Sequence, residues 1–309
     1  PTDGLRQGAV CSECGRWYGL DELIRYEGNW ICGRCKPLFV QRLKEGTRGP
    51  VARQALLGEL QLLQRDYRID IGDCLVRAWI LFATRPGLVI FATLVSGAAF
   101  LGLWLVSILA GFVIPLGGEI LTMMFSGPLL GGFIWFFLRL ARGEAAEVTD
   151  VFAGFRRQFA QLLLASLVQG LIYLACMIPV MLTVLVLALI PLLTQKSISP
   201  AMIAGLIAGT IAALMLAAAV VLFLTTIWTF SLILVVDKGY AFWPAMQLSR
   251  KMVMKRFWMT LAFVVVATII MSAGMFACVV GLLVTVPLFY AMKVFLYEDN
   301  FRDLSPPTV

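Results

Sequence analysis

Four cysteines near the N-terminus have the spacing of a metal site. Cys11 and Cys14 form one C-x2-C pair, Cys32 and Cys35 form a second, and 17 residues separate the two pairs. Two residues between cysteines allow a tight turn to direct both sulfurs at one ion, and two such pairs supply the four thiolates of a tetrahedral zinc site. Because protein atoms would fill all four coordination positions, we predict a structural and not a catalytic Zn²⁺.

Two disulfides are the alternative for the same cysteines. A cytoplasmic location disfavours disulfides, and a domain of about 40 residues buries too little apolar surface to fold unaided. Zinc binding would contribute about 10–16 kcal/mol at neutral pH. We therefore expect zinc, with Arg16, Arg34 and Lys36 offsetting the negative charge of the four thiolates.

A β-hairpin must position the second pair of ligands. The segment from Arg25 to Ile31 has Gly28 and Asn29 at its centre, which predicts a hairpin that leads into Cys32. We place a zinc ribbon at 1–47 and a helical linker at 48–69. The linker carries one apolar stripe, formed by Leu56, Leu57, Leu60 and Leu63.

The charge of the N-terminal segment argues against nucleic acid as its partner. Residues 1–68 hold eleven Lys or Arg and eight Asp or Glu. A zinc ion with four thiolates adds two negative charges, which leaves the segment nearly neutral. Nucleic-acid binding needs a strong positive footprint, so we expect a protein partner and no nucleic acid.

Residues 70–309 have the composition of a membrane protein. Hydrophobic residues make up 61% and charged residues 14% of the whole sequence, whereas about a quarter of a soluble domain is charged. A spanning helix needs about 20 mostly apolar residues, so we predict an all-α polytopic membrane bundle within a lipid bilayer. Five stretches contain no Asp, Glu, Lys or Arg, at 86–118, 120–138, 158–195, 197–236 and 257–292.

These stretches predict six spans, near 87–113, 120–140, 159–190, 201–235, 257–279 and 282–297. The last charge-free stretch has 36 residues, more than one untilted crossing of ~30 Å requires at ~1.5 Å per residue. We expect a hairpin near Gly281 to divide it. One long tilted helix with an interfacial tail is the alternative.

The distribution of Lys and Arg predicts the orientation of the spans. Thirteen of the fourteen basic residues after position 68 fall on one side, including Lys293 and Arg302 near the C-terminus, and only Lys196 falls on the other. By the positive-inside rule, the basic side is cytoplasmic. We therefore expect both termini in the cytoplasm. The N-terminus shows no apolar segment typical of a cleavable signal peptide, so we expect the first span to direct insertion.

A short segment with basic and aromatic residues precedes each pair of predicted spans, at 70–87, 148–159 and 241–258. In the first of these, an apolar helical face opposes Asp73 and Arg77, an arrangement that suits the headgroup level with Arg77 reaching phosphate. We expect three tandem units, each an interfacial helix plus a helical hairpin. Ordinary cytoplasmic loops are the alternative. The apolar face consists of Ile71, Leu75, Trp79 and Phe82.

The third of these segments carries a basic cluster that suits anionic lipid headgroups. Trp243 and Trp258 flank the cluster. Ordinary positive-inside anchoring explains it equally well. The cluster consists of Arg250, Lys251, Lys255 and Arg256.

Two features of the predicted spans bear on packing and transport. Gly127 with Gly131, and Gly205 with Gly209, form G-x-x-x-G pairs that allow close helix packing, within one bundle or between two copies. The remaining cysteines, Cys74, Cys176 and Cys278, are expected to be small packing residues. We expect no charged residue at the middle of a span, which argues against a proton-coupled pump.

One stretch of the membrane part resembles a known bacterial pattern. GPLLGGFIWFFLRLARGEAAEVTDVFAGFRR, residues 127–157, is similar to polytopic membrane proteins of unknown function that look related to the membrane domain of some glycerophosphodiester phosphodiesterases. A Gly-Pro span is followed there by Arg-Gly-Glu and Asp-x-Phe-x-Gly-Phe. The matching residues are Arg142, Gly143, Glu144, Asp150, Phe152, Gly154 and Phe155.

The N-terminal cysteine pairs likewise resemble zinc ribbons fused to several bacterial membrane proteins. Together these resemblances imply six helices in a bacterial inner membrane. No phosphodiesterase catalytic domain accompanies them, so no activity is implied.

These features favour a non-enzymatic membrane protein. The sequence has no histidine, which removes imidazole bases and histidine metal sites, and no nucleophile–base pair is evident. We expect the zinc ribbon to dock a cytoplasmic or membrane-complex partner and the bundle to act as a scaffold. A transporter or channel for a lipid or small molecule, regulated by the ribbon, is the alternative.

Overall fold

The computed structural model describes residues 8–11, 13–14, 16–26, 29–45, 67–114, 117–194, 200–276, 278–302 and 304. The chain divides into two compact units, Pro1–Asp66 with Phe301–Val309, and Tyr67–Asn300. The leucine stripe predicted for the 48–69 linker lies outside the described residues.

The N-terminal unit is built from two antiparallel hairpins and one helix. Strands β1 (Gly8–Val10) and β2 (Trp17–Gly19) form the first hairpin. A 3-10 turn, Leu20–Glu22, leads to β3 (Leu23–Tyr26) and β4 (Asn29–Cys32), which form the second. Helix α1 (Lys36–Glu45) follows directly. The predicted hairpin around residues 25–31 is confirmed, with Arg25 opposite Trp30.

The second unit is helical, as predicted. Its helices α3 (Ile71–Thr84), α4 (Pro86–Val113), α5 (Gly117–Ala141), α6 (Ala153–Arg156), α7 (Phe159–Thr194), α8 (Pro200–Ile227), α9 (Ser231–Lys238), α10 (Phe242–Lys255), α11 (Phe257–Phe276) and α12 (Cys278–Phe301) follow one another in the chain. Among the described residues, six helical segments are long and apolar enough to cross a membrane, at 86–113, 117–141, 159–186, 203–238, 257–276 and 280–301. The predicted number of spans is confirmed.

The last two spans form a hairpin. Helix α11 ends at Phe276 and α12 begins at Cys278. The Thr285 hydroxyl of α12 donates to the Met271 carbonyl of α11 at 3.2 Å, and a Cβ on Gly274 would lie 2.9 Å from the Gly281 backbone. The alternative of one long helix is therefore wrong. The break lies before Gly281, because Gly281 is used inside α12 for this close packing.

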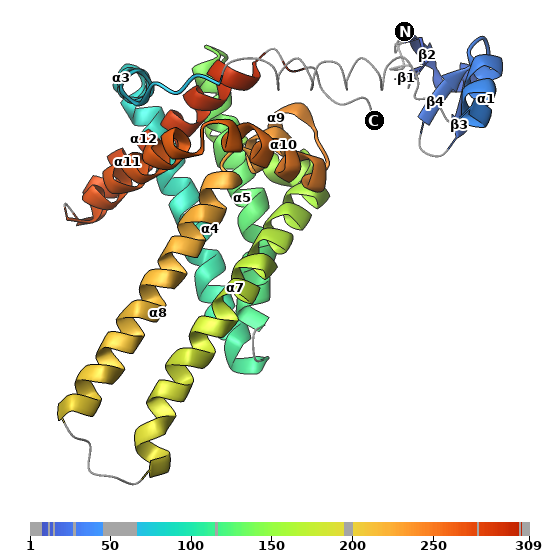
Figure 1. The fold of residues 1–309 in the computed structure, drawn as a ribbon. Coiled ribbons are helices and arrows are strands. Elements are labelled where there is room, and N and C mark those ends of the chain that lie inside the picture. The colour runs from blue at the N-terminus through green and yellow to red at the C-terminus, as the bar shows by residue number, and fades with distance from the viewer. Residues whose placement is uncertain are drawn as a thin grey trace. The chain divides into compact units, whose positions relative to one another are not determined.

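Each of the three helical pairs is preceded by a short helical segment. Helix α3 precedes α4 and α5, the 3-10 segment Val148–Phe152 with α6 precedes α7 and α8, and α10 precedes α11 and α12. Figure 1 shows α7 and α8 running side by side as the longest of these pairs. The chain leaves α5 and α9 in the same way. Gly143, after α5, and Gly239, after α9, have the left-handed backbone conformation, with φ of 74° and 72°. The element order matches the predicted tandem unit.

Glycines in α5 allow two neighbouring segments to pack directly on its backbone. A Cβ on Gly127 would lie 2.4 Å from the Leu162 carbonyl oxygen of α7, and one on Gly132 would lie 1.9 Å from the Val151 carbonyl oxygen. The G-x-x-x-G pair of α5 therefore packs within the unit. A Cβ on Gly205 of α8, by contrast, would have nothing within 4 Å of it.

The fourth span is interrupted, which the charge pattern did not predict. Helix α8 ends at Ile227 and α9 begins at Ser231. The buried Ser249 hydroxyl of α10 donates to the Ile227 carbonyl at 2.8 Å and accepts the Phe230 N–H at 3.2 Å. The break is thus stabilised by a side chain that satisfies the released backbone groups, as irregular backbone at membrane depth requires.

Helix α3 packs on the unit through Cys74, Ala78 and Phe82, which are buried. Trp79 of the predicted interfacial face is 53% exposed, and its place at the headgroup level stays a prediction. The Arg77 guanidinium pairs with Asp73 at 2.7 Å and with Asp299 of α12, and its contact with lipid phosphate stays a prediction. Cys74 is a buried packing residue, as expected.

Candidate metal centre and polar sites of the helical unit

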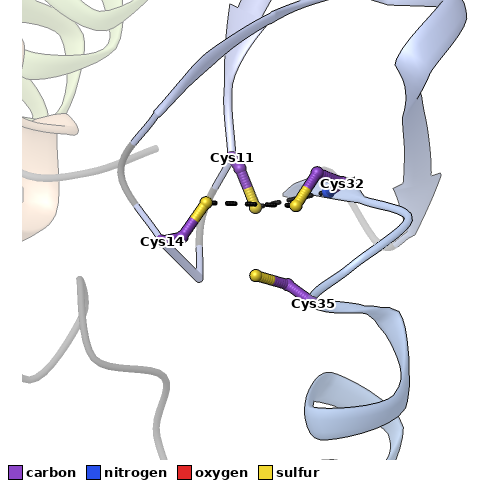
Figure 2. A group of neighbouring side chains, drawn as sticks. All are labelled: Cys11, Cys14, Cys32 and Cys35. Carbon is purple, nitrogen blue, oxygen red and sulfur yellow. Dashed lines mark hydrogen bonds between the residues drawn. The ribbon is translucent and has the colours of Figure 1, made fainter.

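The four predicted metal ligands come together in the N-terminal unit. Cys11 and Cys14 lie in the turn between β1 and β2, and Cys32 and Cys35 lie at the end of β4 and in the turn before α1. Figure 2 shows their side chains converging on one small volume. All four sulfurs lie within 4.8 Å of one another.

The geometry fits a tetrahedral metal ion. Four sulfurs at ~2.3 Å from a zinc ion are about 3.8 Å apart, and Cys14 Sγ lies 3.9 Å from Cys32 Sγ. The Cys32 N–H donates to Cys11 Sγ at 3.3 Å, the kind of second-layer hydrogen bond that orients a thiolate ligand. The four cysteines are free of disulfides, so the donors are available to a metal.

Two of the four cysteines also belong to the core of the unit. Cys11, Leu23 and Cys32 form its buried cluster, with Tyr18 and Trp30 packed against it. Such a core buries little apolar surface, and small domains of this kind depend on a metal or a crosslink. Metal binding and folding are therefore expected to be coupled.

The thiols ionise unequally. Burial opposes ionisation of Cys32, but hydrogen bonds from the backbone and side chain of Cys35 outweigh it and lower the pKa of Cys32 to about 6. Burial, followed by the neighbouring thiol groups, raises the pKa of Cys35. A cation placed among the sulfurs would relieve this mutual repulsion and hold all four as thiolates.

A shallow cleft opens beside the ligands. It has a volume of about 590 Å³, and the Trp17 side chain on its wall is 57% exposed. Arg16 and Arg34, predicted to offset the thiolate charge, are exposed and line the same cleft. An exposed tryptophan between arginines is a composition typical of the energetic centres of protein interfaces.

The sequence did not reveal a buried charge cluster at the ends of three helices. Arg142, just after α5, donates two hydrogen bonds to Asp237 of α9 at 2.7 and 2.9 Å and two to Glu298 of α12 at 2.6 and 3.0 Å. The Tyr297 hydroxyl donates to Asp237 at 2.8 Å. Hydrogen bonding to Asp237 raises the pKa of Arg142, which stays charged. From the sequence, these charged residues were expected in the loops. In the structure they are hydrogen-bonded to one another at the packed ends of three helices.

The network places the basic loops on one face of the helical unit. Besides Arg142, the Arg77 pair with Asp299 joins α3 to α12, and the Arg139 pair with Asp150 at 2.6 Å joins α5 to the segment before α6. The polar ends of the three helical pairs thus gather together. Which compartment this face meets stays a prediction.

Lys293 was grouped with the C-terminal basic residues, although it lies near the end of the predicted span 282–297. In the structure it lies inside α12, two turns before the end of the helix. Its ammonium nitrogen is 4.3 Å from the centre of the Phe289 ring. The expectation that no charged residue lies at the middle of a span stays a prediction.

The predicted headgroup cluster lies on the outside of α10. Arg250, Lys251, Lys255 and Arg256 are all exposed, opposite a buried face that includes Met246 and Met252. Trp243 and Trp258, which flank them, are exposed too. The arrangement is compatible with a membrane surface, and lipid binding there stays a prediction.

Comparison with protein-family models, with curated proteins and with solved structures gives no match. The resemblance to the bacterial membrane pattern therefore rests on the short motifs alone. In the structure these motifs have a packing role, because Arg142 joins three helices and Gly143 ends α5 in the left-handed conformation.

Proposed function

We propose that this protein is a non-enzymatic integral membrane protein that holds a zinc-organised docking module beside the bilayer. The module binds a cytoplasmic or membrane-complex protein, and the six-span unit fixes it to the membrane as a scaffold. The observation that carries the proposal is the exposed Trp17 between Arg16 and Arg34 on a domain whose small core includes two of the four clustered cysteines.

Zinc is the metal of this proposal. Four thiolates in tetrahedral geometry select zinc or iron–sulfur chemistry over hard cations, and a single four-cysteine site at this spacing favours a lone zinc ion. The positive-inside bias of the loops supports a cytoplasmic location for the module and both termini, and the motif resemblance supports the inner membrane of a bacterium.

Several features support a role without catalysis. The chain has no histidine. The buried carboxylate of Asp237 and the carboxylate of Glu298 are both paired with Arg142. A transporter or channel for a lipid or small molecule, regulated by the ribbon, is the alternative. The larger cavity between the spans has an almost wholly apolar lining, which is unsuited to the passage of a polar small molecule and leaves a lipid as the substrate of that alternative.

The test is cross-linking of the full-length protein in native membranes, followed by identification of the attached proteins. Trp17→Ala is expected to lower the yield of the specific adduct at least tenfold while the metal content stays at one ion per chain. Leu38→Ala is the matched control, because Leu38 is an exposed apolar residue on α1 outside the cleft.

Two results would reject the docking role. One is an adduct pattern that Trp17→Ala leaves unchanged. The other is the same set of adducts from a protein that lacks residues 1–47.

A further inference from the structure

The interior of the helical unit holds a second, unassigned site, and it is centred on Lys293. Among the described residues, the Lys293 ammonium has no carboxylate partner, and its contact is the Phe289 ring. Phe289 lies one turn deeper in the span, so the charge points into the unit and not toward the nearer polar end. A cation–π contact offsets only part of the loss of water around a charge.

Lys293 lines a cavity of about 150 Å³ between α5, α7, α8, α9 and α12. Tyr173 and Tyr290 line the same cavity, and within the described part of the chain neither hydroxyl forms a hydrogen bond with protein. Three residues whose side-chain donors form no hydrogen bond within the described part of the chain thus line one space. In an apolar environment such donors need a partner, and an anion with several oxygens provides one.

The break between α8 and α9 lies at the same space. Trp228 and Thr229, at the break between α8 and α9, line the cavity, as do Leu232 and Ile233 of the first turn of α9. The N-terminus of a helix carries partial positive charge and favours anions. Interrupted helices at membrane depth commonly mark binding sites because their irregular backbone faces a cavity.

A larger apolar cavity adjoins this site. It has a volume of about 780 Å³, lies between α4, α5 and α12, and shares Leu130 and Tyr290 with the cavity at Lys293. Leu94 and Leu101 on its rim are 46% and 56% exposed. The cavity therefore opens on the outer surface of the unit, where acyl chains would lie.

The two cavities follow one face of α12. Leu282, Val286, Tyr290 and Lys293 line them in that order and fall within about 80° of one another on a helix of 3.6 residues per turn. Leu282 and Lys293 are separated by about 16 Å along the axis, half of a ~30 Å hydrocarbon core. This separation is close to the thickness of one leaflet.

We propose that this pair of cavities binds one anionic phospholipid. Its phosphate accepts hydrogen bonds from Lys293, Tyr173 and Tyr290, and an acyl chain occupies the apolar cavity toward Leu282. The site is independent of the docking module, so either proposal can fail alone. It is also distinct from the exposed basic cluster on α10.

The test is titration of the purified full-length protein in a neutral detergent with phosphatidylglycerol or phosphatidylcholine, with bound lipid counted by native mass spectrometry. Wild type is expected to bind one phosphatidylglycerol at least tenfold more tightly than phosphatidylcholine. Lys293→Gln should abolish this preference. Arg156→Gln, a charge-matched change at an exposed position of α6 outside both cavities and the basic cluster on α10, should alter the affinity less than twofold.

A second pair of measurements separates a lipid from a free anion. Gly97 lines the apolar cavity, and a Cβ added to it would have nothing within 4 Å, so Gly97→Leu can fill the cavity without a clash. It should weaken phosphatidylglycerol binding at least fivefold and leave any binding of inorganic phosphate unchanged. Inorganic phosphate that competes at the affinity of the lipid would overturn the acyl-chain part of the proposal.

Equal binding of the two lipids by wild type, or an undiminished preference in Lys293→Gln, would overturn the site itself. If Lys293→Gln does not fold, Tyr173→Phe provides the measurement. It removes one donor, keeps the ring, and should weaken phosphatidylglycerol binding several-fold. An unchanged affinity in that variant would count against the proposal in the same way.

Discussion

At the scale of single residues, the cysteine cluster and Lys293 show how burial decides chemistry. Cys11 and Cys32 are buried, so their thiolates need a cation to be stable. Lys293 is partly buried and needs an anion for the same reason. Within the described residues, the thiolates of the first site have no cation beside them and the ammonium of the second has no carboxylate. The first site therefore predicts a bound cation and the second a bound anion.

The first prediction concerns the metal ligands. Cys32→Ser removes a thiolate whose pKa is held near 6 and is expected to lower the bound metal from one ion per chain to below 0.1. Cys176→Ser, a change in α7 far from the cluster in sequence, should leave the metal content unchanged. Elemental analysis of the two purified proteins checks the expectation, and full metal retention by Cys32→Ser would refute the four-thiolate site.

The metal site was predictable from sequence because its chemistry depends on local spacing. Two C-x2-C pairs need only two turns and a hairpin to meet, and each of these has a short-range signal. Lys293 was not predictable in the same way. The sequence placed it near the end of the predicted span 282–297 and grouped it with the basic residues of the C-terminus. Only the packed neighbours in α5, α7, α8 and α9 reveal that it lines a cavity.

At the scale of helices, the Arg142 network joins the ends of the three helical pairs. Asp237 is only 4% exposed in its side chain, and removing its partner would leave a buried, uncompensated charge. We predict that Arg142→Ala destabilises the helical unit by about 3 kcal/mol. Arg156→Ala, at an exposed position, is the control.

Thermal unfolding in detergent, followed by tryptophan fluorescence, measures the effect of these variants. The double variant Arg142→Ala with Asp237→Ala should recover part of the loss, because the unpaired carboxylate is then gone. Equal stability of Arg142→Ala and wild type would show that the network is not formed.

Close backbone packing gives a second prediction at this scale. Gly132→Ala would place a Cβ 1.9 Å from the Val151 carbonyl oxygen, so the segment before α6 must move away from α5. We expect a loss of about 1–3 kcal/mol or more, the usual range for overpacking. Gly102→Ala, with nothing within 4 Å, should leave the unfolding temperature unchanged, and an equal shift in both variants would contradict the packing.

Helix existence was predictable from the charge-free stretches, and helix boundaries were less so. The stretch 197–236 predicted one span. The Ser249 hydroxyl, from a helix further along the chain, accepts a hydrogen bond from the Phe230 N–H and donates one to the Ile227 carbonyl, which allows a break between α8 and α9. Likewise, the hairpin turn at 257–292 lies before Gly281 because Gly274 and Gly281 pack on each other. Both outcomes depend on contacts between distant segments, which a single stretch of sequence does not carry.

At the scale of the whole molecule, the proposed topology has six crossings with the polar helix ends on one side. The three repeated units of short helix and hairpin, and the ion pairs among α3, α5, α9 and α12, are consistent with this arrangement. The docking role adds that the four-cysteine unit lies in the same compartment as those ends.

Labelling with a membrane-impermeant maleimide in intact bacteria, read site by site by peptide mass spectrometry, tests this topology most directly. Ala145→Cys marks the loop after α5 and Ser197→Cys marks the segment between α7 and α8. We predict labelling at position 197 in intact cells, and labelling at position 145 and at metal-stripped Cys14 only after the membrane is opened. Labelling of Cys14 and of position 145 from opposite sides of the membrane would contradict the topology.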